Sequence, residues 1–100
     1  MFDEVIDLLL KRVKECKDSG NMFILPQLPS SVKVEEKRLK GYLFHEEYTL
    51  TLPSGELINI DYSSRDRDRT FQPRPDRSVI QIECKEKDYS FSSGWDETLS

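Results

Sequence analysis

The chain has 100 residues, enough for one domain with a single hydrophobic core but not for a deep cofactor pocket as well. Charged residues make up 34% and hydrophobic residues 36% of the chain, a balance that excludes an intrinsically disordered protein. The formal net charge of −4 disfavours bulk electrostatic binding to nucleic acid, because domains with that function are usually basic.

The first predicted element is an amphipathic helix over residues 3–18. Acidic side chains occupy its first turns and basic side chains its last turns, as the helix macrodipole favours. Gly20 is expected to end the helix in a left-handed conformation. A single apolar stripe predicts that the helix packs against another element. The residues of this stripe are Phe2, Ile6, Leu9, Val13 and Cys16.

The segment after the helix gives weaker signals. Pro26 and Pro29 close the apolar run 22–25 and cannot donate ladder hydrogen bonds, so any strand here would be short or at an edge. Residues 32–40 begin with the alternation of a strand and continue with a charged run that would also suit a helix. We favour a strand or extended chain for them.

The strongest strand signals form a hairpin. Residues 48–52 precede a turn over residues 53–56, with proline early and glycine late, and residues 57–62 return. The alternation of both runs predicts one shared apolar face. That face is expected to carry Tyr48, Leu50, Leu52, Ile58, Ile60 and Tyr62.

Two further strands are predicted towards the end of the chain, over residues 79–84 and 88–92. The remainder, from about residue 93 to residue 100, is expected to be a polar tail. Trp95 would be either a lid over the core or an exposed anchor for an interaction. The inward positions of the first of these strands are Ile80, Ile82 and Cys84.

These elements predict an α+β fold, with one N-terminal amphipathic helix packed on an antiparallel sheet of four to five strands. A single helix can cover one face of such a sheet. The second face is therefore expected to be solvated or to act as a contact surface. Its side chains would be Thr49, Thr51, Asn59, Gln81 and Glu83.

Cys16 and Cys84 are predicted to be reduced, buried and apolar in character, because they lack the spacing of a zinc site. A disulfide between helix and sheet is the less favoured alternative, since no secretion signal is recognised. The apolar run 8–10 is too short for a signal sequence or a membrane span. We therefore expect a cytoplasmic protein.

A segment rich in arginine follows the hairpin and is predicted to be a loop over about residues 63–77. Between residues 65 and 77 it reads RDRDRTFQPRPDR, where three aspartates reduce the charge of five arginines to +2. The guanidinium group binds carboxylates and phosphates through a planar fork. The alternative is a solvated connector whose charges pair with one another. The predicted partner-binding residues are Arg65, Arg67, Arg69, Phe71, Arg74 and Arg77.

His45 is the chain's single histidine and is followed by Glu46 and Glu47. On a strand, His45 and Glu47 would share one face and Glu46 would point to the other. A histidine, a carboxylate and an arginine are the groups that a metal-independent ribonuclease uses. The acidic net charge opposes an RNA substrate, so we favour a partly exposed strand histidine beside solvated glutamates.

We expect a non-enzymatic binding protein, of the inhibitor, immunity or adaptor type, that contacts another protein through the Arg-rich loop. The alternatives are a phosphate or nucleic-acid binder that uses the same arginines, and a small ribonuclease-like enzyme that uses His45. No catalytic residue, cofactor, metal or membrane partner is expected, because the chain lacks the GxGxxG, P-loop, HExxH and EF-hand motifs. A homo-oligomer remains open.

Overall fold

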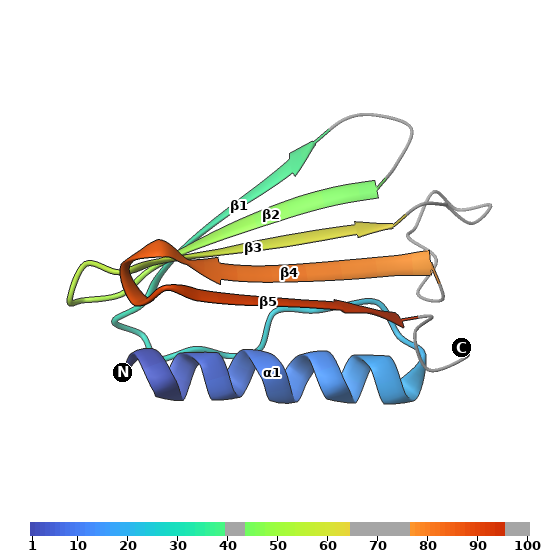
Figure 1. Ribbon diagram of the computed structural model, residues 1–100, viewed down its shortest axis with the longest axis horizontal. Coiled ribbons are helices and arrows are strands. Elements are labelled where there is room, and N and C mark those ends of the chain that lie inside the picture. The colour runs from blue at the N-terminus through green and yellow to red at the C-terminus, as the bar shows by residue number, and fades with distance from the viewer. Residues whose placement is uncertain (40–43, 65–76, 96–100) are drawn as a thin grey trace.

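In the computed structural model, which describes residues 1–39, 44–64 and 77–95, one α-helix packs against one five-stranded antiparallel sheet (Figure 1). The strands follow one another in chain order across the sheet, from β1 to β5. The predicted α+β fold is therefore confirmed. The elements are α1 (Phe2–Ser19), β1 (Lys33–Leu39), β2 (Phe44–Thr51), β3 (Leu57–Ser64), β4 (Ser78–Cys84), the short 3-10 helix η2 (Lys85–Lys87) and β5 (Tyr89–Gly94).

Helix α1 has the predicted one-sided character. It ends at Gly20, whose φ of 68° is left-handed and whose N–H points back to the carbonyls of the last turn. Neither α1 nor any other described helix is both long and apolar enough to cross a membrane. The buried stripe consists of Val5, Ile6, Leu9, Val13 and Cys16.

The segment between α1 and β1 runs back along the helix before it enters the sheet (Figure 1). Its apolar run, residues 22–25, forms no strand; Phe23 is in the core, Met22 and Leu25 pack against it, and Ile24 is exposed. Phe23 is 1% exposed, and its ring centroid lies 6.3 Å from that of Tyr48 and 5.8 Å from that of Tyr62. This segment therefore completes the layer that α1 begins.

Strand alternation in β2, β3 and β4 separates a buried face from an open one. Every second side chain points towards α1, and each predicted inward residue of these strands and of the adjoining turn is at most 7% exposed. β1, at the sheet edge, has a charged sequence and exposed side chains, which discourages pairing with other chains. The inward residues are Tyr48, Leu50, Leu52, Ile58, Ile60, Tyr62, Ile80, Ile82 and Cys84.

The structure corrects two sequence-based boundaries. β5 extends to Gly94, past the start of the tail expected at about residue 93, and the Trp95 Nε1–H donates a 2.7 Å hydrogen bond to the Asn21 carbonyl. Trp95 is 5% exposed, so it is a lid over the core. The Arg-rich loop was expected from about residue 63, but β3 continues through Ser64.

Cys16 and Cys84 are both free and both buried, on α1 and β4 respectively. Cys84 is fully buried and Cys16 is 8% exposed. They therefore pack as small apolar residues, as their positions on the helix stripe and on the strand predicted.

The docking of α1 can be tested with two neighbouring leucines. Leu9 is fully buried and Leu8 is 36% exposed. Leu9→Ala is expected to lower the free energy of unfolding by about 2–5 kcal/mol, because it removes buried methyl groups and leaves a cavity. Leu8→Ala, the matched control, should change it by about 0.5 kcal/mol or less. Urea denaturation measures both, and equal losses would contradict the packing of this stripe on the sheet.

Candidate functional site

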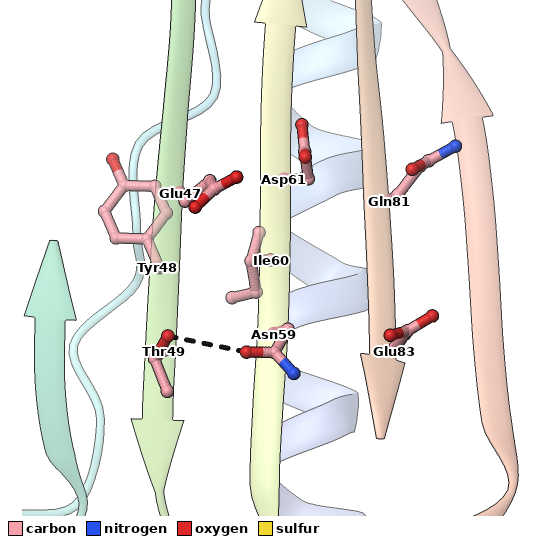
Figure 2. Close-up of a pocket in the computed structure, with 8 residues that line it drawn as sticks. All are labelled: Glu47, Tyr48, Thr49, Asn59, Ile60, Asp61, Gln81 and Glu83. Atoms are coloured by element: carbon pink, nitrogen blue, oxygen red, sulfur yellow. Dashed lines mark hydrogen bonds between the residues drawn. The ribbon is translucent and has the colours of Figure 1, made fainter. Parts of the chain in front are cut away.

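The face of the sheet opposite α1 is covered by no described helix or strand. Figure 2 views this open face, with α1 behind the strands and the side chains of Glu47, Thr49, Asn59, Asp61, Gln81 and Glu83 on the side away from it. The open face carries the alternate residues of β2, β3 and β4, as predicted. Its polar side chains on these strands include His45, Glu47, Thr49, Thr51, Asn59, Asp61, Gln81 and Glu83.

A shallow hollow of about 220 Å³ lies in the middle of the open face. The charged side chains that line it are all carboxylates, and no described lysine or arginine is among the lining residues. Three carboxylates on neighbouring strands give the hollow a negative potential that attracts cations. The lining residues are Glu47, Tyr48, Thr49, Asn59, Ile60, Asp61, Gln81 and Glu83.

Uncharged polar groups complete the hollow. The Thr49 hydroxyl donates a 3.4 Å hydrogen bond to Asn59 Oδ1 across β2 and β3, marked in Figure 2. Gln81 and Glu83, on β4, are exposed. The hollow therefore offers several hydrogen-bond acceptors to a cationic donor such as a guanidinium or ammonium group.

Two of the carboxylates are direct cross-strand neighbours. The register pairs Glu47 on β2 with Asp61 on β3. Like charges directly opposite each other on a sheet destabilise it. The one described side chain recorded within 4.0 Å of both is His45, whose Nε2 lies 2.8 Å from Asp61 Oδ1 and 3.7 Å from Glu47 Oε1.

β1 modifies the charge at one side of the open face. Its outward positions on this face are Lys33, Glu35 and Lys37, which pair in register with β2 residues. Lys37 lies opposite Glu47 in the register, so a positive charge on β1 reduces the negative potential near that carboxylate. The negative potential is therefore centred on β3 and β4, away from this edge.

Glu46 points the other way, into the layer beneath β1 and β2, and is 3% exposed. The Tyr48 hydroxyl donates to Glu46 Oε2 at 3.2 Å, and Arg38 Nη2 lies 3.7 Å from Glu46 Oε1. The pKa of Glu46 is raised, first because burial disfavours the charged form and then because Glu36 hydrogen-bonds to it, while the charge of Arg38 opposes the shift.

Most of the predicted partner-binding residues lie outside the described part of the chain. These are Arg65, Arg67, Arg69, Phe71 and Arg74, all within residues 65–76. Arg77 is described and is exposed immediately before β4. Their role as a contact surface therefore stays a prediction.

His45 and Glu47 share the open face and Glu46 faces away, as the alternation predicted. Asp61 was not predicted as a site residue, because its proximity to His45 and Glu47 is not visible from neighbours along the chain. The signal that could have found Asp61 is the register of the hairpin, which places it opposite Glu47. The burial of Glu46 was also not predicted, since glutamates are rarely buried.

Comparisons with known protein families, with curated proteins and with solved structures each find no match to this chain. The strongest feature is the acidic hollow of the open face.

The raised pKa of Glu46 makes stability depend on pH. The folded protein favours the neutral carboxyl of Glu46. The resulting stabilisation is complete below the ordinary glutamate pKa of about 4.3, and it is lost as the pH rises through the raised pKa of Glu46 in the folded protein. Glu46→Gln keeps the shape without the charge. It is expected to raise the thermal unfolding midpoint at pH 8 and to leave it almost unchanged at pH 4.

Glu35→Gln is the control, because Glu35 is an exposed residue of β1 on the opposite face. It should alter the pH dependence of the midpoint little. A loss of stability in Glu46→Gln at pH 8 would show that the contacts with Arg38 and Tyr48 outweigh the cost of burying the charge.

Proposed function

We propose that this chain is a non-enzymatic binding protein that recognises another protein through the open face of its sheet. Basic side chains of the partner would enter the hollow. The observation that carries this proposal is the set of three carboxylates, Glu47, Asp61 and Glu83, around a hollow with no described basic side chain in its lining.

The scaffold favours such a role. Each carboxylate stands on a central strand whose partner strands fix its backbone position, so little backbone freedom is lost on binding. Charge complementarity raises the association rate and excludes wrongly charged partners. An acidic protein of 100 residues that covers a basic functional surface fits an inhibitor or immunity type of protein.

The Arg-rich segment 65–77 remains a second candidate contact surface on sequence grounds. Its net charge of +2 is opposite in sign to that of the hollow. A partner would therefore have to present an acidic patch to this segment and a basic patch to the open face. Mutations that neutralise one surface at a time separate the two contributions.

Nucleic acid is an unfavourable ligand for the open face, because the carboxylates of the hollow repel phosphates. We expect the protein not to cleave structured RNA. We also expect no RNA binding of the kind that weakens steeply as salt is added. Incubation with RNA and a salt titration of binding test both points. Cleavage that disappears in His45→Ala would establish the ribonuclease-like alternative, and salt-sensitive binding that requires the arginines would establish the nucleic-acid alternative.

The decisive experiment is capture of a partner from the native lysate, followed by affinity measurements with the purified partner in the presence of EDTA. A triple variant, Glu47→Gln, Asp61→Asn and Glu83→Gln, is expected to bind at least about tenfold more weakly, because each carboxylate supplies a charge-assisted contact. The affinity of the wild-type protein should also fall as salt is added.

Two variants control this measurement. The first is a triple variant of exposed residues on α1, with the changes Glu4→Gln, Asp7→Asn and Glu15→Gln. It makes the same change in net charge and should leave the affinity nearly unchanged. In the second, Arg65, Arg67, Arg69 and Arg74 are changed to serine. If the arginine variant loses binding while the open-face variant keeps it, the contact surface is the Arg-rich segment and the proposed face is wrong.

A further inference from the structure

Three side chains of different chemistry converge at one end of the acidic hollow. His45 and Glu47 are two residues apart on β2 and therefore share the open face, and the register of the hairpin brings Asp61 of β3 beside them. One nitrogen and two carboxylate oxygens from these residues lie within 4.8 Å of one another. Each is an atom type that binds metal ions.

The spacing of these atoms is close to that of a metal site. Ligands at zinc distances of 2.0–2.2 Å in tetrahedral geometry lie about 3.3 Å from one another. His45 Nε2 lies 2.8 Å from Asp61 Oδ1 and 3.7 Å from Glu47 Oε1, on either side of that value. The carboxylate oxygens of Glu47 and Asp61 lie within 4.8 Å of each other, so side-chain torsions would have to close at most about 1.5 Å to place all three atoms around one ion.

The hydrogen bonding of His45 is a second, independent observation. Its Nε2 is shielded from solvent, and no described group is aligned with it for a hydrogen bond. The Asp61 oxygen is close enough at 2.8 Å, but the contact lacks the alignment that a hydrogen bond requires. A shielded nitrogen without an aligned partner, beside two opposed carboxylates, calls for a cation between them.

We propose that His45, Glu47 and Asp61 form a binding site for a single divalent transition-metal ion, with Zn²⁺ as the best match. Imidazole favours zinc and its neighbours over magnesium and calcium, while two carboxylates balance the charge of the ion. The three side chains are 30%, 43% and 41% exposed, so a fourth position is open to water or to another ligand. This site goes beyond the proposed binding function and requires no partner protein.

Two effects oppose metal binding. Protons compete for the ligand atoms, as at any site built from these residue types, and Lys37 of β1 lies opposite Glu47 in the register. Both effects lower the apparent affinity for the metal. A dissociation constant in the micromolar range is therefore expected, well short of a structural zinc site.

Calorimetric titration of the chelator-treated protein with ZnCl₂ at pH 7.5 tests the proposal, with one ion bound per chain as the expected result. His45→Asn and Asp61→Asn should each weaken binding at least about tenfold. Glu83→Gln removes a carboxylate from the same hollow but not from the cluster, and it should change the affinity by about twofold or less. Circular dichroism checks that each variant is folded.

NMR of the imidazole identifies the ligand directly, because the chain has one histidine and therefore one set of ring signals. Zinc is expected to shift the Nε2 resonance of His45 in the wild-type protein, and this readout does not depend on any variant. Absence of binding, an unmoved Nε2 resonance, or equal zinc affinity in the wild-type and Asp61→Asn proteins would overturn the proposal. Because the partner measurements contain EDTA, the two proposals fail independently.

Discussion

The burial of one face of the sheet, centred on Tyr62, is the constraint on which the rest of the structure depends. Tyr62 is fully buried, and its ring lies 5.7–6.0 Å from the rings of Phe23, Phe44 and Trp95. Such aromatic pairs contribute about 0.5–1.5 kcal/mol each beyond the burial of their area. The Tyr62 hydroxyl donates to Ser78 Oγ at 3.0 Å, so its polar end is satisfied as well.

One helix and one connecting segment complete this layer, and the described residues place nothing equivalent on the opposite side. The open face is then formed by the alternate residues of each strand, which point away from α1. Lys37 of β1 lies opposite Glu47 on one side, but Asp61 of β3 lies opposite it on the other, and opposed like charges weaken a sheet. Local rules are most often broken at functional sites, which is the reason to seek function here.

Most of the fold was predictable because α1 and the central strands have a clear period, whereas the charged sequence of β1 would suit a strand or a helix. The stripe through Leu9 has the spacing of a helix, and the alternation of Ile80 and Ile82 has that of a strand. The site was less predictable, because it depends on contacts between strands. The turn over residues 53–56 pairs Thr51 with Leu57, and counting outward from that pair reaches Glu47 and Asp61.

Other features had no dependable signal in the sequence. Alternation correctly turns Glu46 inward, but a carboxylate at an inward position contradicts the usual pattern of burial. Its position becomes intelligible only when Arg38 of β1 and the Tyr48 hydroxyl are seen beside it. Similarly, the polar residues around Trp95 favoured a tail, whereas its hydrogen bond to the Asn21 carbonyl joins segments far apart in the sequence.

The proposed metal site and the proposed partner surface share Glu47 and Asp61, so the two ligands must be thermodynamically linked. A bound divalent cation would neutralise both carboxylates and repel a basic partner, and the partner would weaken metal binding by the same factor. A partner that instead supplied a carboxylate or imidazole to the open coordination position would strengthen metal binding. The sign of this linkage therefore distinguishes a surface that recognises cationic side chains from one that joins two proteins through a shared ion.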